Sequence, residues 1–189
     1  MFDHFGLLAP FYEFFIKPKF PDTLVELAGL PVDGPLLDAG GGTGRISQFL
    51  TDLAGQVVLA DLSPKMLAQS LTKPGLKSTV SHTENLPFPE ATFERIIMID
   101  ALHHVCDQAV TAGELWRTLK PGGMILIEEP NADLWMVKIV AWAEKAALMR
   151  SHFLTPEEIK KLFQPFPAQI EIVREDHLAW VMIHKPAGG

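Results

Sequence analysis

A glycine-rich turn follows the first predicted strand of this 189-residue chain. It reads Asp38-Ala39-Gly40-Gly41-Gly42-Thr43-Gly44 and stands between a short apolar strand and a stretch with helical spacing. Glycines let the backbone turn tightly and approach a ligand closely. A second apolar strand ends at Asp61. Ligands of open parallel sheets bind beyond the carboxyl ends of the strands, so Asp61 is placed to accept hydrogen bonds from both hydroxyls of a ribose.

The glycine spacing excludes two common nucleotide sites. A dinucleotide fingerprint that starts at Gly40 requires glycine at the position of Arg45. One that starts at Gly41 requires glycine at the position of Thr43. The Gly-Lys-Ser/Thr of a phosphate-binding loop is absent. The pattern is acidic-x-Gly-x-Gly-x-Gly, carried by Asp38, Gly40, Gly42 and Gly44. It predicts a ribose-bearing ligand and does not require a pyrophosphate.

The elements that must position these residues alternate between strands and helices. The apolar runs predict strands at 36–39, 56–60, 77–80, 95–99 and 124–127. Helical spacing and capping signals predict helices at 45–53, 63–71 and 108–119, and a capping box opens another at Thr155. Residues 170–173 and 178–183 form a predicted hairpin. Apolar strands that alternate with helices predict a parallel sheet covered on both faces.

Charge and cysteine content narrow the class of protein. The chain has 16 basic and 23 acidic residues, a formal net charge of −7. This balance disfavours nucleic-acid binding, whose affinity comes largely from neutralised phosphates. The lone cysteine, Cys106, excludes an internal disulfide framework, and we expect it to be a small buried residue. The adjacent His103 and His104 lack the spacing of metal ligands on one helix face, so we predict no metal site.

Five motifs occur in an order that resembles the class I S-adenosylmethionine-dependent methyltransferases, closest to the ubiquinone/menaquinone-biosynthesis branch. They are Leu37 to Gly44, Leu59 to Ser63, Glu84 to Phe88, Ala101 to Val105 and Leu119 to Gly123. The resemblance implies a doubly wound Rossmann-like fold. We therefore expect an α/β protein whose seven-stranded, mostly parallel sheet ends in a C-terminal antiparallel hairpin.

The resemblance also implies how the cofactor S-adenosylmethionine is bound. Asp38 and Gly40 would hold the methionine end of the cofactor, Gly40 through its backbone. Gly42 and Gly44 would permit the turn, and Asp61 would bind the ribose hydroxyls.

The adenine contacts implied by the resemblance come from two further places, and one more residue is assigned to the methionine part. Leu62 and Met66 would pack against the base, and Met66 can at the same time be part of the core. The family often has an aspartate before the Glu84 motif that contacts the adenine amino group. His82 and Thr83 stand there instead, and a neutral imidazole can accept that hydrogen bond. Asp100 would border the methionine part.

Methyl transfer from a sulfonium demands chiefly that a nucleophile be held in line with the methyl group. A general base helps if the nucleophile is a phenol or an acidic carbon. The candidate catalytic residues are His103, His104 and Asp100, at the end of the fourth strand, with Glu128 and Glu129 as further options.

We expect one domain, in which residues 1–34 form an aromatic helical cover, 35–130 the cofactor-binding core, 131–165 a helical lid insertion and 166–189 the hairpin. Hydrophobic residues make up 48% of the chain, and many lie in residues 1–20 and in a predicted amphipathic helix at 133–150. Two apolar covers indicate an apolar or aromatic acceptor. The alternatives are that they pack on the core, on a second subunit in a homodimer, or on a membrane surface.

The predicted function is methyl transfer to a small acceptor at carbon, oxygen or nitrogen. The alternative is a catalytically silent partner subunit that binds S-adenosylmethionine, which the departure at His82 would fit. An NAD-dependent enzyme is disfavoured by Arg45. The N-terminus lacks the basic region of a signal peptide, and no run of about 18 apolar residues could span a membrane, so we expect a cytoplasmic protein.

Overall fold

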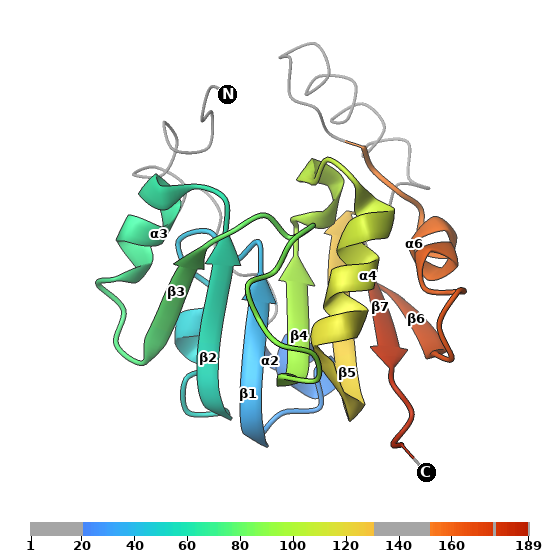
Figure 1. The fold of residues 1–189 in the computed structure, drawn as a ribbon, viewed down its shortest axis with the longest axis horizontal. Coiled ribbons are helices and arrows are strands. Elements are labelled where there is room, and N and C mark those ends of the chain that lie inside the picture. The colour runs from blue at the N-terminus through green and yellow to red at the C-terminus, as the bar shows by residue number, and fades with distance from the viewer. Residues whose placement is uncertain (1–20, 131–151, 176, 189) are drawn as a thin grey trace.

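The computed structural model describes residues 21–130, 152–175 and 177–188 (Figure 1). A seven-stranded sheet runs through the molecule in the order β3-β2-β1-β4-β5-β7-β6. The strands are β1 (Val32–Ala39), β2 (Ala54–Asp61), β3 (Leu76–Val80), β4 (Phe93–Ile99), β5 (Leu119–Pro130), β6 (Gln169–Glu175) and β7 (Leu178–His184). The α-helices are α2 (Pro21–Leu27), α3 (Pro64–Ser70), α4 (Gln108–Thr118) and α6 (Pro156–Leu162).

The pairing of the strands confirms the predicted fold class. Strands β1 to β5 pair in parallel, while β7 runs antiparallel to both β5 and β6. The order reverses at β1, where the chain moves from β3 on one side to β4 on the other. In such sheets the crevice for a ligand lies beyond the carboxyl ends of the strands at this reversal. The glycine-rich turn that follows β1 lies there.

The sheet is buried on both faces, which explains why its strands are almost continuously apolar. One core cluster joins Leu37, Ile96 and Ile125 to Leu115 of α4 and Ile159 of α6. The other cluster joins the opposite side of the same strands to α2 and α3. Figure 1 shows α4 in front of β4 and β5, with α2 behind the sheet.

The helix predicted at 45–53 is wrong, because only a short 3-10 turn, η1 (Ser47–Phe49), forms there. Polar side chains use the groups that a helix would need. The Gln48 side-chain amide donates to the carbonyl of Arg45 at 2.9 Å, and the Thr51 hydroxyl contacts the carbonyl of Gln48 at 3.3 Å. The Ser47 hydroxyl donates to the carboxylate of Asp38. Local side-chain bonds of this kind compete with helix formation.

The predicted burial of Cys106 is also wrong, because its side chain is exposed. The backbone N–H of Cys106 donates to Glu84 Oε1 at 2.8 Å, and that of Asp107 donates to the same oxygen at 3.2 Å. Asp107 then caps α4 by accepting from the N–H groups of Ala109 and Val110. The backbone of this turn is fixed by the carboxylate, and the thiol is left on the outside.

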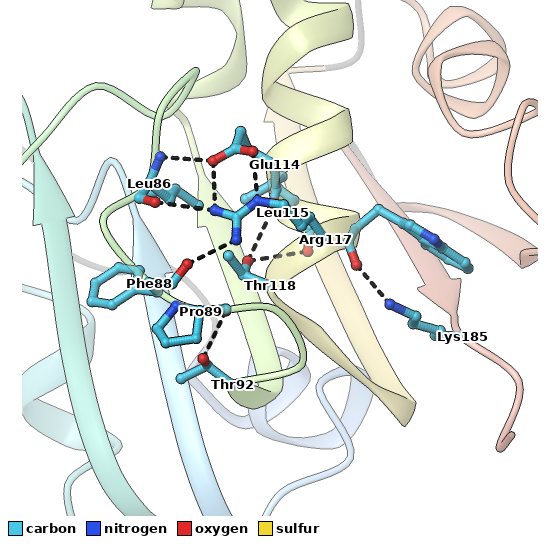
Figure 2. Close-up of polar contacts among 10 residues, drawn as sticks. Leu86, Phe88, Pro89, Thr92, Glu114, Leu115, Arg117, Thr118 and Lys185 are labelled. Carbon is cyan, nitrogen blue, oxygen red and sulfur yellow. Dashed lines mark hydrogen bonds and ion pairs between the residues drawn. The ribbon is translucent and has the colours of Figure 1, made fainter.

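The loop that carries the Glu84 motif is held to α4 by one arginine (Figure 2). The Arg117 guanidinium donates to the carbonyls of Phe88 at 2.8 Å and Leu86 at 3.1 Å. It also binds both carboxylate oxygens of Glu114, at 2.7 and 2.8 Å. Glu114 in turn accepts the backbone N–H of Leu86 at 2.9 Å. The pKa of Glu114 is lowered, first by its hydrogen bond with Arg117.

We expect Arg117→Gln to lower the free energy of unfolding by about 1–3 kcal/mol, because two loop carbonyls and a carboxylate lose a charged donor. Urea denaturation measures this change. Arg174→Gln is the matched control, since Arg174 pairs with Glu157 on the surface, where both side chains are largely exposed. An exposed pair contributes about 0–1 kcal/mol. Equal losses in the two variants would contradict the role given to the loop contacts.

The predicted aromatic cover at 1–20 and the predicted amphipathic helix at 133–150 lie outside the described residues. Across the described ranges, no helix has the length and apolar character needed to cross a membrane.

Candidate functional site

The glycine-rich turn adopts a backbone conformation that other residues rarely adopt. Gly40, Gly42 and Gly44 have φ values of 79°, 53° and 73°, all in the left-handed region. The N–H of Gly40 donates to the carbonyl of Ala60 at 2.7 Å, which ties the turn to the end of β2. A Cβ at Gly40 would lie 2.7 Å from the Cβ of Ala101, closer than real Cβ contacts come. The turn is thus formed by glycine for both conformational and steric reasons.

Asp61 holds the same turn from the end of the neighbouring strand. Its Oδ2 accepts the N–H of Gly42 at 2.9 Å, and its Oδ1 accepts the N–H of Ser63 at 2.8 Å. A carboxylate offers about four acceptor positions and can therefore accept several donors at once. The structure therefore brings Asp61 and the glycine turn together, as the sequence predicted.

Asp38 is a buried acid beneath the turn, with 3% of its surface exposed. Burial is the main cause that raises the pKa of its carboxyl to about 6; the charge of Asp61 raises it further, while the hydrogen bond from Ser47 and the charge of Arg45 lower it. Burial therefore makes ionisation of Asp38 less favourable than ionisation of an exposed carboxyl, although a carboxyl with a pKa of about 6 is mostly ionised at pH 7. A ligand ammonium at this position would supply the missing counter-charge.

Met66 and Leu62, the two residues expected to pack against the adenine, lie in different environments. Met66 is buried, and its Cε lies 3.2 Å from the position that a Cβ at Gly42 would take. It therefore backs the turn from inside the core. Leu62 is a large apolar residue with 48% of its surface exposed. An apolar side chain at this rim is available to a flat apolar ligand.

His82 and Thr83 differ in what they contact. The His82 side chain is 56% exposed, and its Nδ1 lies 3.8 Å from Glu84 Oε2. Thr83 is buried, and its hydroxyl lies 3.3 Å from the hydroxyl of Thr111 on α4. The Thr83 side chain therefore joins the loop to α4. The adenine contact assigned to this pair stays a prediction.

Asp100 and Glu128 form a second acidic group, at the ends of β4 and β5. Asp100 has a φ of 53°, and its N–H donates to the carbonyl of Glu128 at 2.9 Å. Burial, followed by the charge of Asp100, raises the pKa of Glu128 to about 7, against the charge of Arg45. Arg45 thus lies close enough to influence both Asp38 and Glu128.

His103 and Glu129 form a buried pair that the sequence did not predict. Their side chains are each 3% exposed, and His103 Nδ1 lies 2.5 Å from Glu129 Oε2. The sequence alone presents each residue only as a separate candidate for a base. The order of the strands would have predicted this contact, because β5 lies beside β4 with Ile99 opposite Glu128. The residue after Glu128 is therefore next to the turn that follows β4.

His104 is a poor candidate for a base. Its pKa is lowered to about 3, first by burial and then by the charge of His103. A base works best when its pKa lies near the working pH. His104 is therefore a neutral imidazole near pH 7, suited to packing or hydrogen bonding. In the described ranges no group of three or more His, Cys, Asp or Glu residues could hold a metal ion.

Comparisons with known proteins match the part of the chain that contains these residues. A family model described as "Methyltransferase domain" matches residues 37–127. The ubiquinone/menaquinone biosynthesis C-methyltransferase UbiE of Saccharophagus degradans is 36% identical over 115 residues, which cover 56% of this chain and 46% of that protein. The chain thus spans about half the length of the curated relatives it matches.

Solved structures share the fold at low identity. A chain from the complex of the Haloferax volcanii Trm112 methyltransferase activator with a methyltransferase has a TM-score of 0.81 at 18% identity, with 98% and 99% of the two chains covered. An S-adenosylmethionine-dependent methyltransferase from Aquifex aeolicus has a TM-score of 0.74 at 15% identity, with 97% and 98% covered. The cyclase SpnF has a TM-score of 0.70 at 16% identity, with 90% and 82% covered.

Proposed function

We propose that the protein transfers the methyl group of S-adenosylmethionine to a small, apolar or aromatic acceptor, because a family model described as "Methyltransferase domain" matches residues 37–127. The family and the fold imply this cofactor. The observation that carries the proposal is the turn after β1, where three glycines of positive φ lie between a buried acid and the carboxylate of Asp61.

The residues fit the chemistry of the cofactor. A carboxylate at Asp61 suits the ribose hydroxyls, and the buried carboxyl of Asp38 suits a cationic methionine end. The close approach of Gly40 to Ala101 leaves no room for a side chain in the turn, so the backbone itself can face the ligand. Leu62, exposed at the rim, suits the flat face of adenine.

When bound, the cofactor supplies an activated methyl group on a sulfonium. The protein must then hold the acceptor in line, which can contribute roughly 7–11 kcal/mol to lowering the barrier. His103, His104 and Asp100 stay the candidate catalytic residues that the sequence predicts. Among the two histidines, the lowered pKa of His104 leaves His103 as the better candidate for a base.

The relatives at the level of sequence are named as C-methyltransferases, which supports carbon as one accepting atom. The fold by itself does not fix the reaction, since a cyclase shares it. A catalytically silent subunit that binds the cofactor is therefore the alternative, and binding without turnover would favour it.

The proposal is tested first by binding. S-adenosylhomocysteine at about 100 times its Kd should stabilise the protein by about 2.7 kcal/mol and raise its Tm, because it binds the folded state only. NAD should leave the Tm unchanged. Labelled S-adenosylmethionine with quinols, phenols, amines and a cell extract then separates an enzyme from a silent subunit. If S-adenosylhomocysteine does not raise the Tm, the proposal fails.

The cytoplasmic location, the small-molecule acceptor, a homodimer and a peripheral membrane contact stay predictions. The lid role of residues 131–165 and the cover role of residues 1–34 are likewise proposals. Size-exclusion chromatography with light scattering, and flotation with vesicles, would test the dimer and the membrane contact.

A further inference from the structure

Glu129 uses both oxygens of a buried carboxylate to fix the turn that follows β4. Its Oε1 accepts the backbone N–H of Ala101 at 3.1 Å and that of Leu102 at 2.7 Å. Its Oε2 faces Nδ1 of His103 at 2.5 Å. Because the backbone bonds hold one oxygen, the other has a fixed direction toward the imidazole.

The imidazole of His103 is also held from the sides. The ring of Phe153 stacks on it, with centroids 4.2 Å apart and planes 15° apart, and the ring of His104 lies 3.9 Å away at 50°. The N–H of His152 donates to the carbonyl of His103 at 2.8 Å. The side-chain amide of Gln108 donates to the carbonyls of Leu102 at 3.1 Å and His152 at 2.7 Å.

A carboxylate at Nδ1 determines where the proton of a neutral imidazole resides. Glu129 can only accept when ionised, so the ring carries its proton on Nδ1, and Nε2 is the basic nitrogen. The same carboxylate stabilises the ring after it takes a second proton. The stacked Phe153 keeps the ring from leaving this orientation.

We propose that His103 is the general base of the reaction, acting through Nε2, and that Glu129 is its positioning residue. This inference rests on the proposed function and names the acceptor class: a molecule that loses a proton as it is methylated, namely a phenol, an enol or an acidic C–H. The proton passes from the acceptor to Nε2. The electron pair it leaves forms the new bond to the methyl carbon, while the carbon–sulfur bond breaks and its electrons stay on sulfur.

The alternative role for this cluster is purely structural, as a latch between β5 and the turn after β4. Glu129→Gln separates the two roles. The Gln carbonyl can still accept from Ala101 and Leu102, while its NH₂ would donate to Nδ1 and move the ring proton to Nε2. If the cluster is only a structural latch, the variant should behave like the native protein. If His103 is a base, the variant loses the lone pair on Nε2 that would take the proton.

The first readout does not depend on any acceptor. Long-range ¹⁵N–¹H NMR of the histidine rings, assigned with His103→Gln, should show the Nδ1–H form in the native protein and the Nε2–H form in Glu129→Gln. The second readout is turnover with 1,4-naphthohydroquinone. Glu129→Gln should lower kcat by about 10²–10⁴-fold. It should leave the Kd for S-adenosylhomocysteine and the Tm close to native.

Glu157→Gln is the matched control, since it makes the same change on an exposed residue of α6 and should keep native kcat. The Nε2–H form in native His103 would overturn the proposal. Retention of more than about half of the native kcat by Glu129→Gln would also overturn it. If the native protein does not bind S-adenosylhomocysteine, the proposed function fails instead. The tautomer measurement does not depend on that result.

Discussion

Gly40→Ala is expected to weaken S-adenosylhomocysteine binding by at least about 100-fold while the sheet still forms. An alanine at a φ of 79° is strained by on the order of 1–3 kcal/mol. Its Cβ would also lie 2.7 Å from the Cβ of Ala101, and a Cβ cannot move by changing rotamer. Overpacking of this kind costs about 1–3 kcal/mol more. The turn must therefore shift, and the backbone that would face the cofactor shifts with it.

Calorimetric titration with S-adenosylhomocysteine measures the affinity, and far-UV circular dichroism reports the fold. Gly113→Ala is the matched control, because Gly113 lies inside α4 with no atom within 4 Å of an added Cβ. That variant should bind normally and gain about 0.5–1 kcal/mol of stability. Combining Gly40→Ala with Ala101→Gly removes the clash but not the strained φ, so it should recover part of the affinity. Native affinity in the single Gly40→Ala variant would contradict the proposed cofactor site.

Asp38→Asn is expected to have opposite effects on affinity and on stability. The variant lacks the charge that a methionine ammonium would pair with, so affinity for S-adenosylhomocysteine should fall by about 100-fold, a loss typical of a buried charged partner. The Asn carbonyl can still accept the Ser47 hydroxyl, which keeps the local structure. The ligand-free protein should at the same time become more stable above pH 6.

The pH dependence follows from the raised pKa of Asp38. Its carboxyl has a pKa of about 6 in the folded protein, against an ordinary value of 3.8. A proton is therefore held more tightly in the folded state. The stability it contributes is fully present below pH 3.8 and is lost as the pH rises to about 6. The difference between a pKa of 3.8 and one of about 6 corresponds to about 3 kcal/mol.

The test is thermal unfolding of the ligand-free protein between pH 4 and pH 8. The difference in Tm between Asp38→Asn and the native protein should grow in favour of the variant as the pH rises to about 6 and then level off. Asp52→Asn changes an exposed carboxyl just before β2, away from the carboxyl end of β1, and should show no such trend. A Tm difference that does not change with pH would show that burial of Asp38 does not oppose its ionisation.

The sequence predicted the sheet and the cofactor motifs because both depend on local patterns. Continuous apolar runs identified strands that are buried on both faces, and the box at Thr155 correctly opened α6. The glycine turn was predictable since a positive φ restricts the residue type at the position itself. Asp61 followed because the end of a strand fixes where its next side chain lies.

Some local predictions failed because the deciding contacts come from elsewhere in the chain. Ser47 bonds to Asp38 in place of a helical carbonyl, and a full helix does not form at 45–53. Glu84 accepts the N–H of Cys106, and the thiol stays outside although cysteine is commonly buried. Helical spacing and burial preference carry no information about such distant partners.

The sequence by itself predicted the fold class and showed the acid–glycine pattern and the resemblance to methyltransferases, since each is encoded in residue type and spacing. Only the tertiary structure decided which acids are buried and which histidine has a carboxylate partner. Glu129 meets His103 because β5 lies beside β4, and the pKa values of Asp38 and Glu128 rise because the sheet and its covering helices exclude water from them. Strand neighbours and desolvation are properties of the packed chain, which no stretch of sequence specifies alone.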